Sequence, residues 1–560
     1  MAQINNWEEV LYNFLEQSLN AQTGLVQFIR PTIPFNSEQR RAVRAIRDPI
    51  ENVPQNARST QLPARISNVP PEQIHTFTDP GNNFHISRKV VASTLVIGPP
   101  GTGKTHVICS GSALRVFTPG NLLRARRDRG QPERVFIATF SNAGAYRIYE
   151  KFHEIASLAN TPDYFERIKL VQSQYAQDSY SFQVLHQRLN LNPDDFIINN
   201  RMPSNTFIQQ RDWNAILGEV LIFVGTTDSL SILTNDPRSN VRVRGVIYDE
   251  ASQLTVPQFY QVIPTHTIQS ICMIGDDKQL PPVSTLAPLG VSALSYLQGM
   301  NTYQNIPIPI DRRIELHRQY RMHPAIAQIT ERILPIARTV IPDAPTTSND
   351  YVLPRTNYDL NNIPNLNQQT LNVLDEILKP DHPLVILDTS DIPQALDRTV
   401  GRSRINEREA EIALGVYYAL GHAYQGLSNE DIILTAPYRP QVEIFMNHNV
   451  RTGTVHQYQG QEAEAVIYSL TFARPRTKSD FFTQFNLMYV GLSRAKKKLI
   501  IIGNQDAMNH PDRSIQNVRN TIFNFQYIHG GQGYPPYTTN PVARIRLDNA
   551  FLTDINNIII

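Results

Sequence analysis

The residues GPPGTGKT at positions 98–105 decide the fold of the first half of the chain. They follow an apolar stretch, Thr94–Ile97, and lead into a segment with the pattern of a helix. In this strand–loop–helix order the glycines let the backbone curl, so that its N–H groups face a polyphosphate at a helix N-terminus. Lys104 would reach the terminal phosphates, and the Thr105 hydroxyl would bind Mg²⁺. The predicted nucleotide-binding residues are Gly98, Pro99, Pro100, Gly101, Thr102, Gly103, Lys104 and Thr105.

Length and composition indicate a globular protein of several domains. A chain of 560 residues is too long for one hydrophobic core. Its net charge of +2 neither requires nor excludes a nucleic-acid partner. Cys109 and Cys272 lie in apolar surroundings and are predicted to be core residues without a disulfide. The sequence has no apolar run long enough for a membrane span and no basic start of a signal peptide, so we expect an intracellular protein that is neither secreted nor membrane-bound.

Short apolar runs with β-forming residues recur along the chain. Most are apolar throughout, which is typical of parallel strands buried on both faces. Segments with helical spacing separate them; in Glu407–Leu420, for example, Ile412, Val416 and Leu420 share one face. We therefore predict two tandem α/β domains, each a parallel sheet flanked by helices. The predicted strands are Thr94–Ile97, Val135–Thr139, Val220–Val224, Val246–Tyr248, Ile271–Ile274, Leu384–Leu387, Ile432–Leu434, Val466–Leu470 and Leu499–Ile502.

Changes in composition suggest the domain limits. We predict a helical N-terminal segment at 1–34, a first domain at 35–310, a second domain at 311–505 and a C-terminal tail at 506–560. The residues 48–92, rich in Pro, Asn and Gln, are an insert in the first domain, either a reduced accessory element or a loop. A region at about 145–218 has a largely helical pattern, and residues 336–370 are expected to form a long loop.

A second motif completes a predicted ATP site. Asp249 and Glu250 follow the apolar run Val246–Tyr248, which places two carboxylates at the same sheet edge as the phosphate loop. There Asp249 would hold Mg²⁺, and Glu250 would orient and deprotonate the attacking water. Two solvated acids at a strand end are the alternative. Gln279 lies in the polar turn after another core strand, and its amide suits a sensor of the γ-phosphate.

With these residues the chain resembles the superfamily 1 helicases, specifically the up-frameshift-like branch, superfamily 1B. The resemblance implies two RecA-like domains with ATP in the cleft between them. The matching motifs occur in the family's order and cover about residues 35–505: FNSEQ (35–39), GPPGTGKT (98–105), FSNAG (140–144), VGTTDS (224–229), DEASQ (249–253), GDDKQLPPV (275–283), QYRMHP (319–324), LTAPYRPQ (434–441), TGTVHQYQGQEAEAVIYSL (452–470) and VGLSRAKKKLIIIGN (490–504).

The resemblance implies further roles around the nucleotide. Gln39 is similar to the glutamine that reads adenine, Tyr320 to a residue that stacks on the base, and Glu462 to an acid that contacts the ribose. For Tyr320 a place in the core, and for Glu462 a solvated surface, remain alternatives. Arg321 and Arg494 are similar to two arginine fingers, whose fixed charge meets the negative charge that develops on the γ-phosphoryl group.

Small polar residues at strand ends suggest a nucleic-acid track. Ser141 and Asn142, Thr226, and the pair Thr454 and His456 each stand next to a predicted strand, and Arg439 lies in PYRPQ. Such groups can bond phosphate oxygens without reading the base sequence. Helix capping is the equally favoured alternative for the Ser, Thr and Asn residues.

The sequence as a whole predicts an ATP-dependent helicase or translocase. The resemblance implies movement 5′ to 3′ on single strands of RNA or DNA, with ATP and Mg²⁺ as cofactors and a monomeric motor. The alternative is an ATP-switched clamp or ribonucleoprotein remodeller that never separates strands. Only 34 residues precede FNSEQ, too few for the small barrel that this family usually carries before its first domain, and this favours the alternative. A phosphate-loop enzyme acting on a small molecule would leave the motifs of the second domain unexplained.

Overall fold

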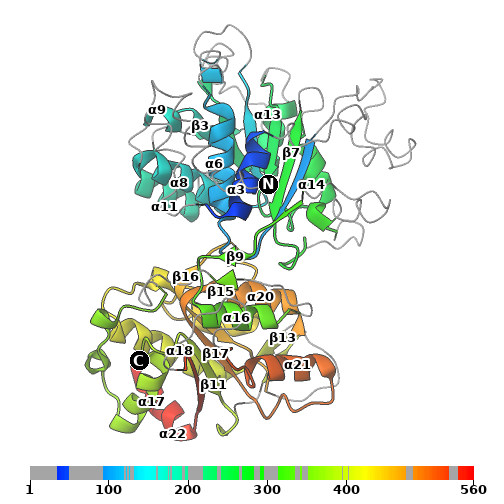
Figure 1. Cartoon of the computed structure of the whole chain (residues 1–560). Helices are drawn as coiled ribbons and strands as arrows, with labels where there is room; N and C mark the ends of the chain where they lie inside the picture. Colours follow the sequence, from blue (N-terminus) through cyan, green and yellow to red (C-terminus); the bar gives the residue numbers. More distant parts are fainter. Residues whose placement is uncertain are drawn as a thin grey trace, which may run out of the picture. The chain divides into compact units, whose positions relative to one another are not determined.

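The computed structural model of the chain (Figure 1) consists of two compact units. The first includes residues up to Gly98, Gly103–Asp277 and Pro281–Leu316, and the second includes Pro99–Thr102, Lys278–Leu280 and residues from His317 onward. The predictions for 1–34 and for most of the insert at 48–92 lie outside the described residues. The residues that the structure describes are 35–48, 92–118, 121–122, 125, 132–158, 162–173, 176, 179–191, 196–199, 219–235, 241–263, 268–282, 291–295, 313–334, 341–342, 351–393, 395, 397–401, 403–458, 460–473, 483–528 and 540–559.

The first unit is built on an eight-stranded sheet with the order β4-β3-β5-β2-β6-β7-β1-β8. All its strand pairs are parallel. Parallel strands all end at the same edge, so the loops that follow β1, β2, β5, β6 and β7 are neighbours. The strands are β1 (Ala92–Ile97), β2 (Val135–Thr139), β3 (Ile168–Ser173), β4 (Phe196–Asn199), β5 (Ile222–Thr226), β6 (Gly245–Tyr248), β7 (Ser270–Gly275) and β8 (Arg313–Glu315).

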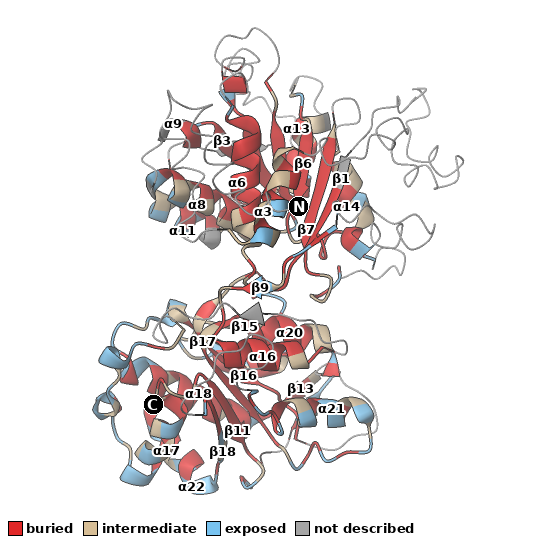
Figure 2. Cartoon of the chain, viewed as in Figure 1, coloured by how far each residue is buried: buried red, intermediate tan, exposed pale blue. Residues whose placement is uncertain are grey.

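Hydrophobic clusters cover both faces of this sheet, because successive strand residues point to opposite sides. Val135 and Ile137 of β2 join the cluster under α3, α6 and α8, whereas Phe136 and Ala138 join the cluster under α13 and α14. The strands in the middle of the sheet, β2, β6 and β7, are therefore buried throughout (Figure 2), as the unbroken apolar runs predict, whereas Arg313 and Glu315 of the edge strand β8 are exposed. The helices are α3 (Ser37–Arg47), α6 (Lys104–Val116), α8 (Asn142–Leu158), α9 (Pro162–Phe165), α11 (Tyr180–Leu189), α13 (Thr227–Asn235) and α14 (Val256–Gln261).

The second unit contains a six-stranded sheet with the order β15-β14-β16-β17-β11-β18. Its pairs are again parallel. The strands are β11 (Leu384–Asp388), β14 (Ile432–Ala436), β15 (Thr452–Thr454), β16 (Ala463–Ser469), β17 (Ala495–Gly503) and β18 (Val542–Arg546). Short strands outside it are β9 (Arg318–Gln319), β10 (Ile341–Pro342), β12 (Arg398–Val400) and β13 (Ser403–Ile405).

Helices also pack on both faces of the second sheet. Leu499 and Ile501 of β17 contribute to one cluster, with α16, α20 and α21, and Ile500 and Ile502 contribute to the other, with α17, α18, α19 and α22. These helices are α16 (Pro324–Arg332), α17 (Gln368–Leu378), α18 (Glu407–Ala423), α19 (Arg439–Met446), α20 (Phe485–Leu492), α21 (Arg513–Ile522) and α22 (Asn549–Ile555). Single 3₁₀ turns occur at Arg355–Asn357, Leu360–Asn362, Asn429–Asp431 and Asn556–Ile558.

The predicted fold class is confirmed, and each of the nine predicted strands overlaps a strand of one sheet or the other. Cys109 and Cys272 are buried free thiols, as predicted. Two regions differ from the expectation. The region expected to be largely helical contains most of α8 together with α9 and α11, but it also contributes β3 and β4, which extend the first sheet.

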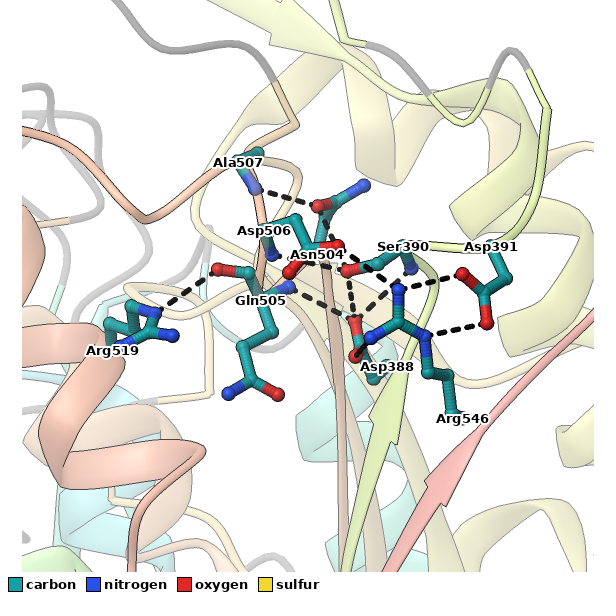
Figure 3. A network of polar contacts seen from close by, with 9 residues as sticks. All are labelled: Asp388, Ser390, Asp391, Asn504, Gln505, Asp506, Ala507, Arg519 and Arg546. Atoms are coloured by element: carbon teal, nitrogen blue, oxygen red, sulfur yellow. Dashed lines mark hydrogen bonds and ion pairs between the residues drawn. The ribbon is translucent and has the colours of Figure 1, made fainter.

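The region expected to be a C-terminal tail contributes α21, β18 and α22 to the second unit. Pairing with β11 explains why β18 is ordered, since it extends the sheet from Leu384↔Val542 to Asp388↔Arg546. Figure 3 shows the polar network at the end of these strands. There Arg546 makes a bidentate ion pair with Asp391, with both N–O distances 2.6 Å, and a 3.0 Å contact with Asp506.

Candidate nucleotide and nucleic-acid site

The phosphate loop lies between β1 and α6. Gly103 is the residue before α6 and has φ +82°, and Gly101 has φ +77°, conformations that glycine adopts without strain. The Thr102 hydroxyl donates to Pro99 O over 2.9 Å. Lys104 Nζ donates to Gly98 O over 2.7 Å, so its ammonium lies along the loop. A polyphosphate would offer this ammonium and the helix N-terminus charged acceptors.

Gln39 is placed against this loop by the start of α3. A reciprocal capping box holds it: Gln39 N donates to Asn36 Oδ1 over 2.8 Å, and Asn36 N donates to Gln39 Oε1 over 3.0 Å. Its Nε2 is so close to the loop that a Cβ on Gly103 would lie 2.5 Å from it. The structure thus brings together Gln39 and the phosphate loop, which are far apart in the sequence.

The acidic pair lies at the end of β6. Asp249 N donates to Ala138 O over 2.9 Å, and Glu250 N donates to Asp249 Oδ1 over 2.9 Å. Burial and the neighbouring Glu250 raise the pKa of Asp249 to about 6, while the charges of Arg147 and Lys104 act in the opposite direction. Asp249 is therefore a buried carboxyl group within electrostatic reach of Lys104. A carboxylate and the half-buried Thr105 hydroxyl are the hard oxygen ligands that Mg²⁺ takes, so these residues fit that ion.

Glu250 is held by two side chains that sequence reasoning did not find. Its backbone has φ +51°, which is uncommon for a residue with a Cβ. Arg147 NH2, from α8, donates to Oε1 over 2.7 Å, and Gln253 Nε2 donates to Oε2 over 2.9 Å. No sequence signal reveals the Arg147 contact, because it depends on β2 pairing next to β6.

In the second unit, Arg321 and Glu462 form an ion pair of 2.5 Å, and Lys496 lies 3.1 Å from the other carboxylate oxygen. Burial alone would raise the pKa of Glu462, but these cations lower it to about 2. Arg494 is buried, with bonds from NH1 to Gln461 O over 3.0 Å and from Nε to Val490 O over 2.8 Å. The unit thus brings Arg321, Glu462 and Arg494 together.

Two other predicted nucleotide contacts also belong to the second unit. Tyr320 and Gln279 are both half-buried, so neither is a core residue. The Gln279 carbonyl accepts a 3.1 Å bond from Asn486 Nδ2. Their predicted roles toward the base and the γ-phosphate are not tested by these contacts.

Three of the predicted nucleic-acid residues share one edge of the first sheet. Ser141 and Asn142 follow β2, and Thr226 ends β5, where it is paired with Thr139 of β2. Ser141 Oγ accepts from Gly144 N over 3.2 Å, and Thr226 Oγ1 accepts from Ser229 N over 3.2 Å. These are capping bonds, the alternative considered for these residues, although a hydroxyl can also donate outward. Asn142 is exposed beside them.

The other three lie together in the second unit. Arg439 follows β14. Thr454 is the last residue of β15 and pairs with Ala436, the last residue of β14. The Arg439 side chain is 83% exposed and makes an exposed ion pair with Glu443, 3.1 Å long, so it can turn toward a phosphate. His456 is exposed two residues beyond Thr454. Each unit therefore gathers its candidate contacts where adjacent parallel strands end.

Two parallel α/β sheets, the first carrying a phosphate loop and an acidic pair, define a protein with tandem RecA-like domains. Comparison with known families agrees with this class: two families described as AAA domains match residues 86–285 and 300–506. These two matches, together with the helicase relatives described next, indicate that the chain is a member of the superfamily 1 helicases, in the up-frameshift-like branch, superfamily 1B.

Curated relatives are similar to parts of the chain. The DNA replication ATP-dependent helicase/nuclease DNA2 of Xenopus laevis is 26% identical over 277 residues, which is 48% of this chain and 25% of that protein. The DNA polymerase alpha-associated DNA helicase A of Schizosaccharomyces pombe is 27% identical over 280 residues, covering 48% of this chain and 38% of that protein. The ATP-dependent helicase upf1 of the same yeast is 23% identical over 436 residues, covering 73% of this chain and 43% of that protein. The chain thus spans less than half the length of each of these three relatives.

Two features are absent from the described residues. None of their helices combines the length and the apolar character that a membrane crossing needs. Nor do they contain a group of three His, Cys, Asp or Glu side chains arranged to hold a metal ion. Mg²⁺ in proteins commonly takes several of its ligands from phosphate and water.

Proposed function

We propose that the chain is a nucleic-acid-stimulated ATPase of the helicase type, which moves 5′ to 3′ along single-stranded RNA or DNA as a monomer. The observation that carries the proposal is the grouping of four residues of the first unit, Gln39, Lys104, Asp249 and Glu250, at the phosphate loop. The direction of movement is taken from the family, and the relatives named as DNA helicases and as upf1 support a nucleic-acid track.

Each residue at the loop has one proposed task. Lys104 would exchange the Gly98 carbonyl for a phosphate oxygen, and Gln39 Nε2 would face the base. Asp249 and Thr105 would hold Mg²⁺, which neutralises phosphate charge when bound. Glu250 would accept the proton of the attacking water, and Gln279 would sense the γ-phosphate.

The second unit would complete the reaction. Arg321 and Arg494 would stabilise the charge that develops on the γ-phosphoryl group, so that hydrolysis requires both units. Glu462 would contact the ribose and Tyr320 the base. Arg321 would have to exchange its ion pair with the half-buried Glu462 for the phosphate, whose negative charge would take the place of the carboxylate.

The first experiment measures ATP turnover with and without single-stranded oligonucleotides of RNA and of DNA. The proposal expects at least one of them to raise turnover. Glu250→Gln is expected to keep nucleotide affinity and lower turnover by about 10²- to 10⁴-fold, the range of a lost general base. Lys104→Ala is expected to weaken both. Turnover that no polynucleotide raises, or a Glu250→Gln variant as active as wild type, would refute the proposal.

Strand displacement on duplexes with a 5′ or a 3′ tail then tests the motor itself. Displacement restricted to the 5′-tailed duplex is the expected result. Stimulated turnover with no displacement of either duplex would instead identify an ATP-switched clamp or remodeller.

A further inference from the structure

Glu250 is tied to the start of α8, the helix that begins at the candidate nucleic-acid residues of the first unit. Arg147 of α8 donates to Glu250 Oε1 over 2.7 Å. The helix begins at Asn142, so Arg147 stands five residues further on, about 7.5 Å along the axis. One side chain therefore connects a proposed nucleic-acid contact with the proposed base.

The first turn of α8 is itself fixed to strand β2. Ser141 O accepts from Ala145 N over 3.1 Å and from Thr139 Oγ1 over 2.8 Å. Ser141 Oγ accepts from Gly144 N over 3.2 Å. Because the turn is bonded to the helix that follows it, a displacement of the turn by a phosphate bound at Ser141 or Asn142 would be passed on to the first turns of α8.

Arg147 and Gln253, which both bond to the Glu250 carboxylate, differ in whether they can pass on a movement of α8. Gln253 lies three residues after Glu250 in the same turn, so it moves with the carboxylate. Arg147 comes from a separate helix, and its planar guanidinium fixes the direction of a carboxylate more strictly than a neutral amide does. The Arg147 side chain is 33% exposed and that of Glu250 only 10%, so loss of this partner would leave a largely buried carboxylate less firmly held.

We propose that Arg147 is a positioning residue through which nucleic acid at the start of α8 sets the orientation of the Glu250 carboxylate. The inference rests on the proposed function, in which Glu250 is the base. Nucleic acid that shifts α8 changes the Arg147–Glu250 contact, and hence turnover, without changing how tightly ATP binds.

The test compares three variants of the full chain. Arg147→Gln removes the charge, and Arg147→Lys keeps the charge but not the planar fork. Arg188→Gln is the matched control. Arg188 also makes an ion pair with a glutamate, Glu150 of α8, over 2.8 Å, but Glu150 is not part of the acidic pair. For each variant, kcat and KM for ATP are measured with and without oligothymidylate and oligouridylate, together with oligonucleotide affinity and thermal stability.

For Arg147→Gln we expect the ratio of stimulated to basal kcat to fall about tenfold, the effect typical of a residue that orients a functional group. The KM for ATP and the oligonucleotide affinity should stay near wild type, Arg147→Lys should recover part of the ratio, and Arg188→Gln should keep all of it. An unchanged ratio, or a loss of ATP and oligonucleotide affinity in step with a loss of stability, overturns the inference.

Two results separate this inference from the proposed function. If wild type is not stimulated, or Glu250→Gln hydrolyses ATP normally, the proposed function fails whatever Arg147 does. If both of those tests succeed and Arg147→Gln keeps the full ratio, only the role of Arg147 is refuted. Should Arg147→Gln not fold, Arg147→Lys decides: a reduced ratio supports the role and a full ratio refutes it.

Discussion

Asp249 and Glu409 are buried carboxyl groups, one in each unit, with opposite surroundings. Burial raises the pKa of both, of Asp249 to about 6 and of Glu409 to about 8. Asp249 has the cations Lys104 and Arg147 nearby, and their charges favour its ionised form. The carboxylate of Glu409 instead accepts from Ser469 Oγ over 2.8 Å and from Thr471 N over 2.9 Å. Glu409 is therefore a structural group under the second sheet.

Glu409 should make the stability of the second unit depend on pH. Its pKa is raised from 4.5 to about 8 on folding, so the unfolded chain releases its proton first. The stability that protonated Glu409 contributes to the folded protein is complete below its unfolded pKa of 4.5. This stability is lost as the pH rises toward 8, by up to about 1.4 kcal/mol per pH unit. The nearby Asp397 adds to the effect by like charge, and Arg404 pairs with Asp397.

The predicted pH dependence is checked by urea unfolding of wild type and Glu409→Gln at about pH 5.5 and about pH 7.5. The neutral amide cannot lose a proton in this range, so wild type should lose stability relative to the variant at the higher pH. A difference that is the same at both pH values would mean that Glu409 is already ionised in the folded protein.

At the scale of elements, α3 is held closely against α6 by a glycine. A Cβ on Gly111 would lie 2.8 Å from Ile46 Cβ, closer than side-chain atoms approach. This contact matters for the site because α3 also carries Gln39, whose amide lies over Gly103. A small residue in the middle of one helix thus fixes the place of a predicted base-reading side chain on another.

We predict that Gly111→Ala destabilises the first unit. Replacing glycine in a helix normally gains up to about 1 kcal/mol, but overpacking of this contact should cost about 1–3 kcal/mol, so the net effect is unfavourable. Gly421→Ala in α18 is the control, since nothing lies within 4 Å of the added Cβ there and the helical gain should appear alone. Thermal unfolding of both variants measures the contrast, and a more stable Gly111→Ala protein would contradict the predicted contact.

At the scale of the whole molecule, each unit has its own sheet with hydrophobic clusters on both faces. The second is completed by residues near the C-terminal end of the described chain. Phe551, Leu552 and Ile555 of α22 are buried against α17 and α18. Arg546 adds polar contacts at the exposed end of β18 (Figure 3), which contribute less than this apolar burial because surface ion pairs are screened by water.

Truncation should distinguish these contributions. A chain ending at residue 505 lacks α21, β18 and α22, and we expect its second unit to aggregate because the faces under these helices become exposed. A chain ending at residue 528 keeps α21 and should still be unstable, whereas Arg546→Ala should fold with only a small loss of thermal stability. Soluble expression and circular dichroism measure the outcome. A chain ending at 505 that folds normally would show that the C-terminal residues are dispensable.

The sequence by itself determined the class of fold and the parts of the site that depend on local chemistry. Uninterrupted apolar runs marked nine strands because parallel strands are buried on both faces. Glycines and residues at strand ends marked the phosphate loop and the acidic pair because the backbone conformation there is local. Family motifs then supplied the predicted partners of the nucleotide.

Tertiary structure decided what depends on the order of strands in space. Arg147 reaches Glu250 across 103 residues of sequence because β2 pairs beside β6. The position of Gln39 next to Gly103 depends on the packing of α3 against α6. Residues 542–546 form strand β18 because they pair with the edge of β11. Such contacts are fixed by the packing of distant segments, and no local pattern of residues encodes them.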